Sequence, residues 1–212
     1  MKTLVLLFAT QCILFAHPDP KAKMLLDNVH KQYKKMGTLE IFFSYEQTND
    51  KKNKISNSGQ LLSKGSQFKL ILPDMEIYSN GKIQYTYLKN NNEVQITTPD
   101  EKENKYHPKF LSAIYLSGTH NFSLSGKEKF AGKLLTIVEF IPIDKMESIN
   151  KIRLYISEKS NLIEKVEWSE KKGNNTIVTF TKTAANNLIP DTAFEFNTKN
   201  LKGVHIEDLR EE

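Results

Sequence analysis

The chain has 212 residues, of which 30 are Lys or Arg and 25 are Asp or Glu, so its formal charge is +5 at neutral pH. The basic residues are scattered through polar turns such as NDKKNK and SEKKGNN and do not gather with aromatic residues on one element, which argues against nucleic-acid binding. A modest positive charge would still help a protein to approach an anionic membrane surface.

The N-terminus has the pattern of a secretory signal peptide. Lys2 supplies the charge, residues 4–15 form an apolar run that is too short to span a bilayer, and Ala16 is the small residue at the cleavage site. We therefore expect a signal peptide over residues 1–16 and one mature domain over residues 17–212, without a thiol. The alternative that Cys12, the one cysteine, is acylated stays open, although Gln11 stands where lipoprotein processing requires a small residue.

One amphipathic helix follows. Asp19 is a good N-cap residue and Pro20 is favoured at the first helical position. Apolar residues then recur at three- and four-residue spacing until Gly37, namely at Ala22, Leu25, Val29, Tyr33 and Met36.

Most of the remaining chain has the alternating pattern of β-strands. The predicted strands cover residues 38–48, 59–63, 67–72, the two arms around Asn80-Gly81, 93–98, 133–143, 151–157, 162–169 and 176–183, with a further strand near 192–196. Asn80-Gly81 predicts a type I′ turn, because that turn needs positive φ at both central residues. Residues 107–118, HPKFLSAIYLSG, predict a short helix, which we call the lid segment.

These elements predict the fold class. About ten consecutive antiparallel strands with short turns favour a mainly β (α+β) domain built on one strongly curved sheet, or unclosed antiparallel β-barrel. The edges and mouth of such a sheet need cover, and the two predicted helices would supply it. No linker of Gly, Pro or Ser composition divides the chain into two domains.

The sequence carries little reactive chemistry. It has no nucleophile elbow, phosphate loop, dinucleotide fingerprint or zinc-protease motif, and its five histidines are far apart along the chain, so we expect no cofactor and no metal. Ser169 and Lys172 match a serine–lysine pair by spacing alone, within a charged turn. An acid/base site assembled by folding, from carboxylates such as Glu139 and Glu167, stays open.

The alternating apolar side chains have two possible roles. For any one of them the hydrophobic core is the commoner role. Two light helices would nevertheless have to fill a concavity made by about ten strands, so a cavity for an apolar guest is the alternative.

Residues 59–96 resemble the diagnostic segment of LolA, the periplasmic outer-membrane lipoprotein carrier family. That family has a Gly-x-Leu strand, a basic turn, an aromatic-led strand and an Ile-x-Ser-Asp-Gly-Lys turn before an aromatic strand. Asn80-Gly81-Lys82 matches its turn, and Tyr85 and Tyr87 match its aromatic pair. FFSYEQT, the lid segment and the closing residues 194–210 resemble further parts of the family, so the resemblance spans nearly the whole mature chain.

The resemblance implies a monomeric periplasmic carrier that is not an enzyme. It would take acylated lipoproteins from an inner-membrane lipoprotein-releasing transporter, shield their acyl chains in a hydrophobic cavity and pass them to an outer-membrane acceptor. Lys64 stands where the family commonly has an arginine that hydrogen-bonds the lid, so Lys64 would be the lid latch. The expected acyl-chain contacts are Ile41, Phe43, Tyr45, Phe68, Leu70, Leu72, Ile83, Tyr85, Tyr87, Leu111, Ile114 and Tyr115.

Two other functions remain alternatives at this point. A lipid-anchored receptor or sensor of the same fold would retain Cys12 as its first mature residue. A periplasmic enzyme acting on a lipid or glycan would need a catalytic constellation, and the absence of known motifs counts against it.

Overall fold

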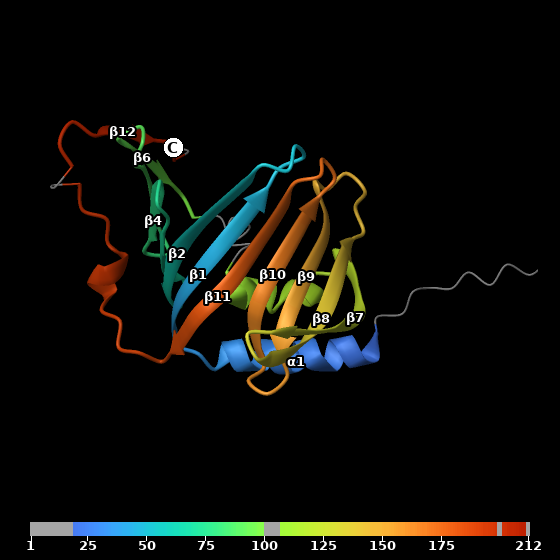
Figure 1. Ribbon diagram of the computed structural model, residues 1–212. Coiled ribbons are helices and arrows are strands. Elements are labelled where there is room, and N and C mark those ends of the chain that lie inside the picture. Colours follow the sequence, from blue (N-terminus) through green and yellow to red (C-terminus); the bar gives the residue numbers. More distant parts are fainter. Residues whose placement is uncertain (1–18, 100–106, 199–200, 211–212) are drawn as a thin grey trace, which may run out of the picture.

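The protein is built on one sheet of twelve strands that bends over on itself (Figure 1). The computed structural model describes residues 19–99, 107–198 and 201–210, so the expected signal peptide and Cys12 lie outside the described residues. The strand order is β12-β6-β5-β4-β3-β2-β1-β11-β10-β9-β8-β7, and β12 and β7 form its two separate edges. The sheet is therefore unclosed, as the sequence predicted.

The strands are β1 (Thr38–Thr48), β2 (Lys54–Lys64), β3 (Gln67–Ile71), β4 (Met75–Ser79), β5 (Gln84–Leu88), β6 (Glu93–Thr97), β7 (His120–Phe130), β8 (Lys133–Pro142), β9 (Ile149–Ser157), β10 (Leu162–Glu170), β11 (Asn175–Ala185) and β12 (His205–Asp208). Neighbouring strands are antiparallel, except that β12 runs parallel to β6. The predicted strands are present with shifts of a few residues at their ends, apart from the one near 192–196.

Three differences from the predicted strands have local causes. β2 begins at Lys54, five residues before the predicted start. The prediction missed this part because the first five residues of the strand are exposed and carry no apolar alternation. β7 was not predicted, since a bulge between Leu124 and Gly126 interrupts its alternation. The predicted strand near 192–196 is wrong, because Asp191–Phe194 form the short 3₁₀ helix η3 directly after Pro190.

The turn between β4 and β5 also differs from the prediction. The ladder ends at Ser79 and Gln84, which leaves a four-residue loop instead of a two-residue type I′ turn. Within this loop, only Gly81 has positive φ, at 87°. The Asn80 side chain accepts hydrogen bonds from the N–H groups of Lys82 and Ile83, both at 2.9 Å, so it closes the loop in the way of an Asx-turn.

Helix α1 (Pro20–Lys34) begins where the sequence predicted. Asp19 caps it by accepting hydrogen bonds from the N–H groups of Lys21 and Ala22, at 2.9 and 3.3 Å. The second carboxylate oxygen of Asp19 accepts the N–H of Leu124 at 3.0 Å, which ties the start of the helix to β7. The cap thus fixes both the helix end and its position on the sheet.

The helices cover one half of the inner face of the sheet, the face on which α1 packs. The α1 helix contacts β7, β10 and α2 (Pro108–Leu111), and the 3₁₀ helix η2 (Ile114–Leu116) contacts β7 (Figure 1). Buried side chains of α1, such as Leu26 and Tyr33, join a core with Phe140 of β8 and Leu154 of β9. The helices therefore fill the half of the inner face that β7–β10 provide.

Candidate functional site

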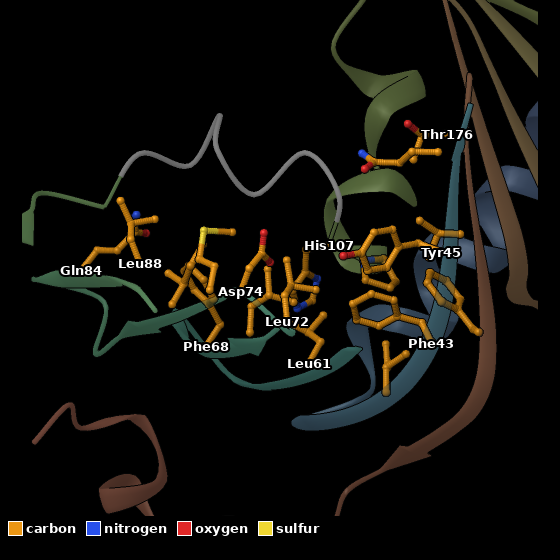
Figure 2. A pocket seen from close by; sticks show the side chains of 18 of the residues that line it. Phe43, Tyr45, Leu61, Phe68, Leu72, Asp74, Gln84, Leu88, His107 and Thr176 are labelled. Carbon is orange, nitrogen blue, oxygen red and sulfur yellow. The ribbon is translucent and has the colours of Figure 1, made fainter. Parts of the chain in front are cut away.

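An apolar cavity of about 700 Å³ occupies the other half of the inner face, where β1–β5 meet β11. Figure 2 shows Leu88 toward one end, Phe43 and Tyr45 toward the other, and Phe68 between them. Side chains of each strand alternate between the two faces of the sheet. The inward-pointing side chains that line the cavity therefore adjoin the hydrophobic core.

Six of the predicted contact residues line this cavity. They are Ile41, Phe43 and Tyr45 of β1, Phe68 and Leu70 of β3, and Leu72 just beyond β3. The prediction missed Leu61, Met75, Ile77, Leu88, Val178 and Phe180. The alternation of β2, β4 and β5 carried the signal for four of these residues, whereas Val178 and Phe180 lie beside β1 only because β11 pairs with it across the sheet.

Tyr85 and Tyr87 lie on the opposite face of β5 from the cavity, where Gln84 and Leu88 line it. Their rings contact Phe196, with centroid distances of 5.6 and 6.1 Å. Ile83 belongs to the loop before β5 and is not among the described residues that line the cavity. The expected placement of these three side chains on the cavity wall is therefore wrong, because alternation separates two faces without showing which is the inner one.

Most of the lid segment packs on the helical half of the sheet. Leu111, Ile114 and Tyr115 are buried in the core cluster. The Tyr115 hydroxyl donates to Asp27 of α1 at 2.6 Å, and its ring meets Phe122 edge-on. The first two residues of the lid segment, His107 and Pro108, are the part of it that lines the cavity.

The polar groups of the cavity are uncharged or acidic. Gln47, Asp74, Asn90 and Asn91 are exposed and stand at its rim, while Glu170 and Thr176 are half-buried. No Lys or Arg is present among the described residues that line the cavity, although the whole chain is basic. The described part of the cavity wall is therefore apolar with an uncharged or acidic rim.

His107 is a titratable group in the cavity wall. Its Nδ1 accepts the N–H of Lys109 at 3.0 Å and so caps α2. Burial, and to a smaller extent the nearby Lys109 charge, lowers the pKa of His107 to about 4. The imidazole is therefore neutral at neutral pH and adds no cation to the apolar wall.

Acidification should destabilise the fold through His107. An unfolded histidine has a pKa of roughly 6.5. Between pH 6.5 and about 4 the unfolded state therefore binds more protons at this site, and the protein becomes less stable as the pH is lowered. His107→Asn keeps a cap acceptor without the titration. We expect the wild-type melting temperature to fall more steeply than that of the variant across this window, with His120 contributing equally to both; parallel curves would contradict the assignment.

Lys64 contacts the segment that follows β11. Its Nζ donates to the carbonyl of Ile189 at 3.2 Å and to the Asp191 carboxylate at 2.8 Å. Both partners belong to residues 186–198, which we call the C-terminal segment, and not to the lid segment. Phe196 of the same segment packs on Tyr78, Tyr85 and Tyr87, so the segment covers the outer face of β4 and β5.

Lys64→Leu is expected to loosen the C-terminal segment without unfolding the domain. The Lys64–Asp191 pair is largely exposed, and such pairs contribute about 0–1 kcal/mol. Hydrogen exchange of residues 186–198 should accelerate several-fold while the melting temperature changes little. If Lys64 is also a latch on guest release, the off-rate of a fluorescent acylated peptide will change; equal off-rates would remove the latch role.

Among the described residues, no three His, Cys, Asp or Glu side chains lie close enough to hold a metal ion. No helix in the described part of the chain is long and apolar enough to cross a membrane. Glu139 and Glu167 do come together on the outer face, where Arg153 lies 2.9 Å from one and 3.7 Å from the other. The two glutamates and Arg153 thus form an ion-pair network on the face of the sheet away from the cavity.

Comparisons with known proteins identify the fold and the family. Residues 14–172 match the family model described as outer membrane lipoprotein carrier protein LolA. An uncharacterized conserved protein from Thermus thermophilus has a TM-score of 0.60 at 11% identity, over 90% of this chain and 99% of that chain. The Mycobacterium tuberculosis lipoprotein LppX has a TM-score of 0.52 at 11% identity, over 81% and 98%.

At such identities the two structures show a shared fold. The search of curated proteins gave no match. The family match ends before β11 and the C-terminal segment, yet it spans more than half of the chain. The chain therefore belongs to the outer membrane lipoprotein carrier protein LolA family.

Proposed function

We propose that this protein is a periplasmic carrier that shields the acyl chains of lipoproteins in the cavity between β1–β5 and β11. It would receive them from an inner-membrane lipoprotein-releasing transporter and pass them to an outer-membrane acceptor. The observation that carries the proposal is the cavity itself, an apolar space of about 700 Å³ in a member of the LolA family.

The chemistry of the wall fits an acyl chain. Phe43, Phe68, Leu70 and Ile77 offer apolar surface, and each methylene group that they bury contributes roughly 0.8 kcal/mol. With no cation in the described lining, the guest would be held by this nonspecific contact alone. Such binding suits transfer, because no ion pair has to be broken when the chain leaves.

The volume also bears on the number of chains. Sites of roughly 300–1,000 Å³ typically enclose one drug-sized ligand, and the cavity lies within that range. A lipoprotein with several long acyl chains would fill more than this space, so part of the cargo would lie outside the cavity. Incomplete enclosure would keep the affinity low enough for release.

A binding titration tests the proposal. A fluorescent palmitoylated peptide should bind saturably to the purified protein, and the same peptide without the acyl chain should not. Mass spectrometry of the protein recovered from the periplasm should show acylated material bound and a mature N-terminus at His17. Lack of saturable binding would contradict the carrier function, hydrolysed lipid products would favour an enzyme, and an acylated Cys12 would favour the anchored receptor.

A further inference from the structure

The sheet splits beside the cavity. β2 pairs with β1 along its whole length, from Thr38–Lys64 to Thr48–Lys54. Its ladder with β3 ends at Gln60–Ile71, and the next residue, Leu72, donates its N–H to the carbonyl of Met75 instead. Beyond Gln60, therefore, no backbone ladder joins β2 to β3 in the described chain.

A groove of about 530 Å³ lies on the outer side of this split. Phe42, Ser44, Ser58 and Gln60 line it, and they alternate with the β1 and β2 residues that face inward. Phe43 and Leu72 line both the groove and the cavity. These two side chains are therefore the partition between the two spaces.

Gly59 makes the partition thin. A Cβ atom at this position would lie 2.5 Å from Cζ of Phe43 and 2.8 Å from both the carbonyl oxygen of Ile71 and Cδ2 of Leu72. A glycine inside a strand often marks a place where another group approaches closely. Here the missing side chain leaves room for the Phe43 ring, and this ring and Leu72 close the split.

The backbone around the partition is held in place. Lys89 donates to the carbonyl of Leu72 at 3.0 Å and pairs with Glu76 at 3.0 Å. The Phe43 side chain is half-buried, and so is that of Leu72. No β-ladder hydrogen bond crosses the split, so the side chains of Phe43 and Leu72 are what separates the cavity from the groove there.

We infer that the split is a lateral portal, through which the far end of a long acyl chain passes Phe43 and Leu72 and lies in the outer groove. This inference rests on the proposed carrier function. The portal would give the cargo the space that the cavity alone lacks. It would also distinguish acyl chains by their length. A short chain ends inside the cavity, whereas a long one extends through the sheet.

Photolabelling of the wild-type protein locates the chain end. Octanoyl and palmitoyl peptides that carry a diazirine on the last carbon are bound and irradiated, and the labelled residues are identified by mass spectrometry. The octanoyl probe should label the inner wall, such as Ile77 and Leu88, and the palmitoyl probe should also label Ser58, Gln60 or Pro73. Palmitoyl labelling confined to the inner wall would overturn the portal, while a lack of saturable labelling by either probe would overturn the carrier function as well.

Variants of the partition give a second readout. Gly59→Ala crowds the split, so the affinity for the palmitoyl peptide should fall several-fold and that for the octanoyl peptide should stay unchanged. Ser56→Ala, at an exposed position on the same strand, is the control. If Gly59→Ala fails to fold, Phe43→Ala serves instead and should raise the ratio of palmitoyl to octanoyl affinity; equal changes for both peptides would contradict the portal.

Discussion

Ile77→Glu is expected to weaken binding of a palmitoylated peptide by roughly 15- to 60-fold. This factor corresponds to lost contact with two or three methylene groups at about 0.8 kcal/mol each. Ile77 is half-buried at the centre of β4 and faces the cavity. The domain should stay folded, because a carboxylate that faces an open cavity can remain hydrated, unlike one in a packed core.

The matched control lies on the neighbouring strand and the other face. Tyr87→Glu on β5 removes a ring contact with Phe196, and such aromatic pairs contribute about 0.5–1.5 kcal/mol. This variant should lower the melting temperature and leave the affinity unchanged. Fluorescence titration and thermal melts of both variants check the pair, and a comparable loss of affinity in both would contradict the assignment of the inner face.

Phe68 is a poorer position for the same test. The sequence pattern suggested that Phe68→Glu would reduce uptake with the fold intact. In the structure the Phe68 side chain is only 8% exposed and belongs to the core cluster as well as to the cavity wall. A charge there would disturb folding and binding together, so half-buried Ile77 separates the two effects better.

The alternation of single strands was readable in the sequence, but the choice of face was not. On β5 the pattern correctly separated Tyr85 and Tyr87 from Gln84 and Leu88. The family resemblance placed the tyrosines on the cavity wall, whereas Phe196, more than a hundred residues later, is the partner that covers them. A contact between such distant residues leaves no local signal.

Pairing across the sheet was the second source of error. Val178 and Phe180 line the cavity because β11 lies beside β1. The sequence pattern of β11 does not distinguish it from the other strands. The lid segment likewise contains the expected apolar residues, but Tyr115 is held by Asp27 of α1 and lies on the helical half. Of the lid segment, His107 and Pro108 are the residues that line the cavity.

Because the inner face is divided into a helical half and an open half, a substitution beneath α1 should change the stability of the protein without changing its affinity for the guest. Leu26 of α1 is fully buried against the sheet. Leu26→Ala should lower the free energy of unfolding by about 2–5 kcal/mol, the usual range for deletion of a buried leucine side chain. Met24→Ala on the same helix, at a side chain that is 65% exposed, should change it by no more than about 0.5 kcal/mol.

Guest affinity should not follow this loss of stability. Leu26 packs over the helical half, whereas the cavity is lined by β1–β5 and β11, so under conditions where both proteins are folded Leu26→Ala should bind the palmitoylated peptide as the wild type does. Urea denaturation measures the stability and fluorescence titration the affinity. A folded Leu26→Ala protein with weakened binding would mean that the acyl chain reaches beneath α1, because a guest confined to the open half has no contact with that side chain.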